Sequence, residues 1–133
     1  MKKLPSSFAI ILASDVRLEV DQKFTMTGIF PGTIVIHKNP GESYGLLTLA
    51  CYAEFYEADG PYSINIQVSI PDSEVLAHAE IPNSDEHKGT MTIAGKFQNI
   101  KIEKDGDYNL SITINGKSFT KSFGVELVET ESE

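Results

Sequence analysis

The sequence predicts an all-β domain, folded as a two-sheet antiparallel β-sandwich. Apolar side chains recur at every second position in many short segments, as they do in strands with one buried face. Glycine, proline, asparagine and aspartate separate these segments and supply the turns. No segment has the sustained three-and-four spacing of an amphipathic helix. Many short strands joined by such turns are typical of sandwiches and barrels.

Two segments show the alternation most clearly, and both are predicted strands. Residues 62–70 place these apolar side chains on one face: Tyr62, Ile64, Ile66, Val68 and Ile70. Residues 108–114 do the same with Tyr108, Leu110, Ile112 and Ile114. The residues between them are Ser, Asn, Gln and Thr, so the opposite face is polar. A helix would mix the two sets.

Further strands are expected in segments rich in β-branched and aromatic residues, which favour extended backbone. In chain order they are residues 8–20, 24–30, 33–37, 46–56 and 75–81. Together with a segment near residues 91–102, they bring the expected total to nine or ten strands.

The segment 91–102 changes the phase of its alternation part-way. Its apolar residues fall on one parity up to Phe97 and on the other at Ile100 and Ile102. A β-bulge near Gln98 and Asn99 would place all of them on one face, because a bulge inserts one extra residue into a strand.

The turns support antiparallel neighbours. Asn115 and Gly116 tolerate the positive φ of a type I′ hairpin, and residues 71–73 suit a tight reversal. The longest break is residues 82–89, and none of the breaks resembles an interdomain linker. We expect one domain at residues 1–128, followed by an acidic tail at residues 129–133.

Charge restricts the partners that the protein can bind. Eleven basic and nineteen acidic residues give a formal charge of −8. Binding to nucleic acid depends on Lys and Arg, and anionic membranes attract the same cations. We therefore expect neither nucleic acid nor membrane as a partner.

The single cysteine, Cys51, cannot form an intramolecular disulfide, so nothing indicates an oxidising compartment. Only six apolar residues precede Ser14 and Asp15, a run too short for a dependable signal peptide. A cytoplasmic protein is the simplest interpretation.

The stretch DGDYNLSITINGKSFTKSFGVEL, where Gly106, Asp107 and Tyr108 open a strand, resembles the closing strands of immunoglobulin-like sandwiches. The stretches ASDVRLEVDQKFTMTGIF and GPYSINIQVSIPDSEVLAHAEI are similar to a family of small bacterial proteins described only as a domain of unknown function. This resemblance covers nearly the whole chain. It implies an immunoglobulin-like sandwich and no activity. The cysteine pair and core tryptophan of antibody domains are absent.

Motifs of catalysis and metal binding are not found in the sequence, so we expect neither an enzyme nor a cofactor or metal. Cys51 shares the parity of core residues, which predicts a buried thiol instead of a nucleophile. Residues 85–87 hold two acids and a histidine, but a solvated loop explains them. Residues 105–109 begin like a calcium loop, and the pattern then fails at Leu110 and Gly116.

Surface tyrosines are the candidate binding residues. Tyr52 and Tyr56 share the parity of Glu54, opposite the apolar face of the same strand. Tyr44 lies in the preceding loop and is a weaker candidate. Outward aromatic rings can anchor a partner, although tyrosines covered by neighbouring structure would show the same pattern.

Three function classes remain. A noncatalytic protein-interaction or assembly module ranks first, with an unknown protein as partner or with edge strands pairing into a homo-oligomer. A carbohydrate-binding module ranks second, with the absence of tryptophan against it. An enzyme with a dispersed site ranks last.

Overall fold

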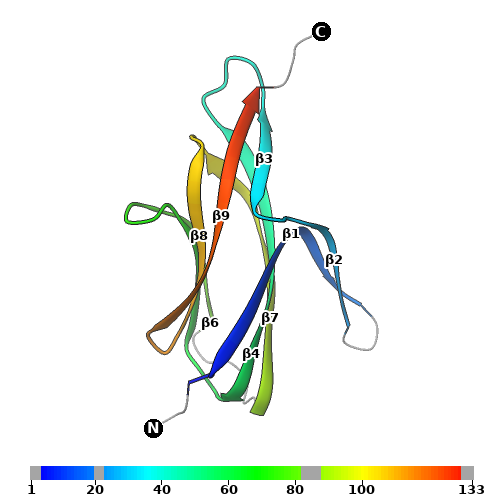
Figure 1. Ribbon diagram of the computed structural model, residues 1–133, viewed down its shortest axis with the longest axis vertical. Coiled ribbons are helices and arrows are strands. Elements are labelled where there is room, and N and C mark those ends of the chain that lie inside the picture. The colour runs from blue at the N-terminus through cyan, green and yellow to red at the C-terminus, as the bar shows by residue number, and fades with distance from the viewer. Residues whose placement is uncertain (1–3, 20–22, 82–87, 130–133) are drawn as a thin grey trace.

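The computed structural model describes residues 4–19, 23–81 and 88–129, and these form two packed β-sheets (Figure 1). The four-stranded sheet has the order β2-β1-β4-β7 and consists of β1 (Ser7–Leu18), β2 (Phe24–Ile29), β4 (Gly45–Asp59) and β7 (Lys88–Ile102). The five-stranded sheet has the order β3-β9-β8-β5-β6 and consists of β3 (Thr33–Lys38), β5 (Ile64–Ser69), β6 (Val75–Ile81), β8 (Gly106–Ile114) and β9 (Lys117–Glu129). The predicted all-β, two-sheet fold is confirmed.

The order of the strands is of the immunoglobulin type. In the five-stranded sheet, β9, β8, β5 and β6 follow one another as strands G, F, C and C′ do in variable-type domains. No helix that could cross a membrane occurs in the residues described. Of the predicted break at residues 82–89, residues 88 and 89 belong to β7, and residues 82–87 lie outside the described residues. Of the predicted tail at residues 129–133, Glu129 is the last residue of β9, and residues 130–133 lie outside the described residues.

One strand pairing differs from the expected antiparallel arrangement. β3 pairs with β9 in parallel, from Thr33 opposite Gly124 to Lys38 opposite Glu129. Parallel neighbours need a long crossover, and here the intervening strands of the domain supply it. Alternation along a strand reveals its buried face but not the direction of its neighbour, so this pairing was not evident from the sequence.

The core lies between the sheets and includes the faces that the alternation predicts. In β5 the residues Ile64, Ile66 and Val68 are buried, and they alternate with half-buried polar residues. β4 and β8 contribute the same pattern, and one apolar cluster includes residues of both sheets. Hydrophobic burial between the two sheets is therefore the main source of stability.

The predicted bulge is present in β7. Leu47 pairs with Ile100 and Leu49 with Phe97, so Gln98 and Asn99 together oppose the single residue Thr48. Asn99 has a φ of 59°, a left-handed conformation that asparagine tolerates better than most residues. The extra residue restores the phase, and the apolar residues on both sides of it face the core.

The predicted hairpin turn is also present. Asn115 and Gly116 both have positive φ, at 47° and 90°, as a type I′ turn requires. It joins β8 to β9 and sets their antiparallel register, with Ile114 opposite Lys117.

Candidate functional site

The three central candidate residues lie side by side on β4. Tyr52, Glu54 and Tyr56 are alternate residues of this strand and are half-buried, whereas the intervening Phe55 is fully buried. β4 is flanked by β1 and β7, and Glu54 pairs in register with Ala9 and Thr92. The small Ala9 leaves Glu54 and the two tyrosines accessible on the outer face of the four-stranded sheet.

Hydrogen bonds join these side chains into one unit, which we call the Tyr-Glu-Tyr cluster. The Tyr52 hydroxyl donates to Oε1 of Glu54 at 2.6 Å, and the Tyr56 hydroxyl donates to Oε2 at 2.8 Å. One carboxylate therefore holds both rings in place. Hydrogen bonds to an ionised acceptor are the stronger kind, so the rings are fixed more firmly than exposed tyrosines usually are.

The same bonds set the protonation of the cluster. Donation by Tyr52, and then by Tyr56, lowers the pKa of the Glu54 carboxyl. The bonds to Glu54 raise the pKa of both tyrosine hydroxyls. At neutral pH the carboxylate is charged and the hydroxyls keep their protons, which is the state that the hydrogen bonds need.

The hairpin formed by β1 and β2 borders the cluster. The Phe24 ring on β2 meets the Tyr52 ring edge-on, with centroids 5.4 Å apart. Phe24 is 38% exposed, and Ile11, which pairs with Tyr52 in register, is 39% exposed. The cluster therefore adjoins two apolar side chains that the described residues leave partly uncovered.

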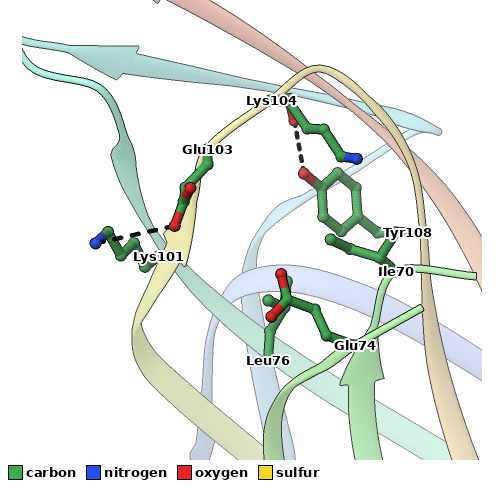
Figure 2. Close-up of a pocket in the computed structure, with 7 residues that line it drawn as sticks. All are labelled: Ile70, Glu74, Leu76, Lys101, Glu103, Lys104 and Tyr108. Atoms are coloured by element: carbon green, nitrogen blue, oxygen red, sulfur yellow. Dashed lines mark hydrogen bonds and ion pairs between the residues drawn. The ribbon is translucent and has the colours of Figure 1, made fainter.

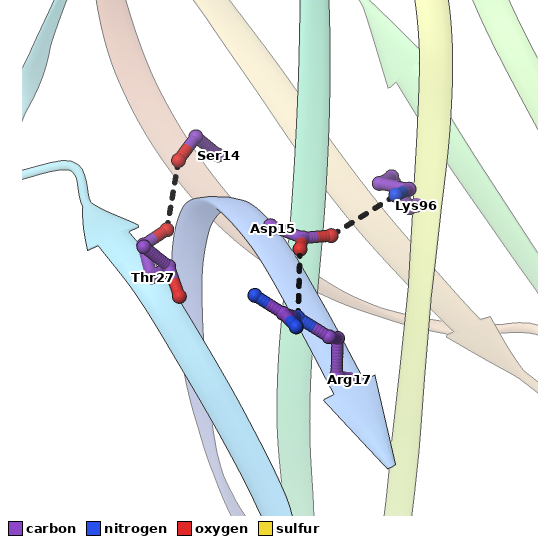
Figure 3. A network of polar contacts seen from close by, with 5 residues as sticks. All are labelled: Ser14, Asp15, Arg17, Thr27 and Lys96. Carbon is purple, nitrogen blue, oxygen red and sulfur yellow. Dashed lines mark hydrogen bonds and ion pairs between the residues drawn. The ribbon is translucent and has the colours of Figure 1, made fainter.

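An ion pair fastens this hairpin across the outer face of β4. Asp15 on β1 contacts Lys96 on β7 at 3.0 Å and Arg17 at 3.3 Å (Figure 3). The hydrogen bond from Lys96 is the main reason that the pKa of Asp15 is lowered. Ser14 also donates to the backbone carbonyl of Thr27 at 2.8 Å, which ties β1 to β2.

Tyr44 does not join the other candidates. It lies just before β4, and eight extended residues separate it from Tyr52 by roughly 25 Å. The Lys101 ammonium lies 4.6 Å from the centre of its ring. The structure thus groups three of the four predicted binding residues and leaves Tyr44 at the far end of the strand.

A small pocket that sequence reasoning missed lies beside β8. It has a volume of about 160 Å³, and its lining is shown in Figure 2: Ile70, Glu74, Leu76, Lys101, Glu103, Lys104 and Tyr108. Lys101 and Glu103 approach to 3.9 Å. Two of the lining side chains are acidic and two are basic, so the lining has no net formal charge.

Tyr108 at this pocket forms a tyrosine corner. Its hydroxyl donates to the backbone carbonyl of Lys104, four residues earlier, at 2.6 Å. This is the arrangement found near the start of strand F in immunoglobulin-like sandwiches. Asp105 accepts the backbone N–H of Leu127 at 2.7 Å, so its carboxylate is part of the same corner. From the sequence, the Gly106-Asp107-Tyr108 stretch is predicted only as the start of a strand, and β8 does begin at Gly106.

Cys51 is a core residue, as its parity predicts. It is 1% exposed, and burial raises the pKa of its thiol to about 11. The thiolate is therefore scarcely populated at neutral pH. Within the described part of the chain, no group of three or more His, Cys, Asp or Glu side chains is placed to hold a metal ion. Residues 85–87 lie outside it.

Comparison with known proteins gives only partial structural matches at low sequence identity. No family model and no curated protein matches the chain. Among solved structures, a β-glucosidase from Listeria innocua in complex with glucose is 9% identical, with a TM-score of 0.37 over 90% of this chain and 16% of its own. A family 123 glycoside hydrolase from Clostridium perfringens is 16% identical, with a TM-score of 0.39 over 94% of this chain and 28% of its own. The chain thus spans less than a third of either protein.

Proposed function

We propose that the protein is a noncatalytic module that binds a partner protein through the outer face of its four-stranded sheet, centred on the Tyr-Glu-Tyr cluster. One observation carries this proposal: both tyrosine hydroxyls donate to a single carboxylate, so the rings are fixed before a partner arrives. Fixed side chains lose little further entropy on binding, and this favours affinity.

The surroundings of the cluster support a protein partner. Tyrosine is enriched among the residues that dominate binding energy at interfaces. The partly exposed Ile11 and Phe24 next to Tyr52 supply apolar area, and the charged Asp15 and Lys96 lie beyond them. An apolar centre with a polar rim is the usual anatomy of a protein interface.

The protonation of the cluster also favours binding over proton transfer. A carboxylate with a lowered pKa is a weak base, and a tyrosine with a raised pKa is a weak acid. Neither shift brings a pKa closer to neutral pH, where a general acid or base is most effective.

A glycan is the second candidate ligand. Each Glu54 oxygen receives one tyrosine hydroxyl and keeps a lone pair that a sugar hydroxyl can use. The flanking rings offer surfaces on which a sugar can stack. A glycan array probed with the wild-type protein and with the Tyr52→Ala, Tyr56→Ala double variant would reveal such binding.

Site-specific photo-crosslinking in the native host tests the proposal. A crosslinking residue at Ala94, an exposed position that pairs with Tyr52, should trap a discrete partner protein. The same residue at Thr120, exposed on the other sheet, is the matched control. The Ala94 crosslink should disappear in the Tyr52→Ala, Tyr56→Ala variant while the fold persists. Equal crosslinking from both positions, or a crosslink that survives the double substitution, would contradict it.

A further inference from the structure

The N-terminal half of β1 presents an open backbone edge. β2 pairs with β1 only from Ala13 to Leu18, Phe30 continues along Leu12, and within the described residues no other strand lies along residues 7–11 on that side. The Leu12 carbonyl points away from β4, because it accepts the N–H of Phe30 at 2.9 Å. Successive residues of an antiparallel strand direct their backbone groups to alternate sides. The amides of Phe8 and Ile10 therefore face the open side.

This edge lacks the features that usually prevent edge pairing. Ser7–Ala13 contains no charged residue and no proline, in a chain of formal charge −8. The other outer strands are protected differently: β3 contains Lys38, β6 contains Glu80, and β7 contains three lysines. β2 is uncharged, but Gly28 at φ +68° interrupts its extended backbone. Charged side chains and irregularities of this kind normally block association between edges.

The open edge is complementary to itself. If two copies pair in antiparallel fashion about a two-fold axis at Ala9, Phe8 of one copy lies opposite Ile10 of the other, and each such pair exchanges two main-chain hydrogen bonds. Phe8 is 43% exposed and Ile11 is 39% exposed, so both have apolar surface left to bury. Ala9 meets Ala9 at the axis, where the small side chains allow close approach.

We propose that two copies of this chain form a symmetric dimer by antiparallel pairing of β1 through Phe8 and Ile10. A second copy fits this edge because the segment is uncharged, so two like-charged molecules can approach here with the least repulsion. The dimer joins two four-stranded sheets into one and presents both Tyr-Glu-Tyr clusters on its outer face. The proposal does not depend on what that cluster binds.

Sedimentation equilibrium of the purified chain tests the dimer. The mass should double with increasing concentration, and added salt should strengthen association because it screens the repulsion between acidic molecules. Ala9→Lys places two lysines opposite each other at the axis and should weaken dimerisation roughly fivefold or more. Ala94→Lys, the same change on the same face of β7, should leave it unchanged.

A mixture of two variants tests whether the two-fold axis of the dimer lies at Ala9. Ala9→Lys and Ala9→Glu should each dimerise weakly alone and form a heterodimer when mixed, because opposite charges then face each other. A wild-type chain that stays monomeric, a dimer indifferent to Ala9→Lys, or a mixture that gives no heterodimer would overturn the proposal. A monomer that still crosslinks a partner from Ala94 would refute the dimer and leave the proposed function standing.

Discussion

Two tyrosines in this molecule donate hydrogen bonds of the same length to acceptors of different kinds. Tyr108 in the corner and Tyr52 in the Tyr-Glu-Tyr cluster each donate a bond of 2.6 Å. Tyr108 is 2% exposed, stacks on Phe123 at 5.9 Å, and donates to a backbone carbonyl. Tyr52 is half-buried and donates to the side chain of Glu54.

The difference between them lies in what each bond holds. A bond to the backbone in the core fixes the path of the chain between β7 and β8, so its loss should affect folding. A bond to a side chain on the surface fixes only the positions of the rings, so its loss should affect recognition. Variants at the two places should therefore separate stability from binding.

The largest effect is expected from Tyr108→Ala. Removing a buried aromatic side chain leaves a cavity, and the free energy of unfolding should fall by about 3–5 kcal/mol. Denaturant unfolding measures this change. Tyr56→Ala, on the outer face of the sheet, is the matched control and should lower the free energy of unfolding much less, because no cavity forms in the core. Similar losses of unfolding free energy for the two variants would contradict the view that Tyr108 serves folding and the cluster serves recognition.

Removing only the hydroxyl groups should again destabilise the protein more at Tyr108 than at Tyr52, but the difference in the free energy of unfolding should be smaller. Tyr108→Phe leaves the Lys104 carbonyl without its donor, at a cost of about 1–2 kcal/mol. Tyr52→Phe leaves Glu54 with its bond from Tyr56 and with access to water, so its free energy of unfolding should change by less than about 1 kcal/mol. A larger loss for Tyr52→Phe would mean that the cluster is a folding element.

The smallest effect is the dependence of stability on pH that the Glu54 carboxylate of the cluster should produce. The folded-state pKa of Glu54 lies below its ordinary 4.5, so its stabilising contribution is present above that value and is lost as the pH falls through the lowered pKa. Glu54→Gln should therefore be slightly less stable than the wild type at pH 7, and the difference should vanish in acid. Urea titrations at several pH values would show it. A constant difference would contradict the hydrogen-bonded, ionised state of Glu54.

Alternation of side chains was enough to predict most of the fold. It identified the buried faces of β5 and β8, and the change of phase in 91–102 located the bulge at Gln98 and Asn99. It could not supply the parallel pairing of β3 with β9, because that pairing joins residues far apart in the chain. A period of two records which side of a strand is buried and holds no information about its neighbour.

The same limit determined which parts of the candidate site could be predicted from the sequence. Parity placed Tyr52, Glu54 and Tyr56 on one face, and residues two apart on a strand are close enough to bond. The contact of Phe24 with Tyr52 and the ion pair between Asp15 and Lys96 depend on how the β1–β2 hairpin lies against the sheet. Tyr44 was grouped with them by residue type alone, and the length of β4 separates it.

The parallel pairing of β3 with β9 also affects synthesis. A ribosome releases β3 about 90 residues before it releases the stretch of β9 against which β3 pairs. At translation speeds of about 5–20 residues per second, β3 remains without its pairing strand for several seconds or more. During that interval Ile34 and Ile36, which are buried in the folded protein, cannot yet be buried in a complete core. The nascent chain is therefore most prone to aggregation, or to binding by chaperones, just before β9 emerges.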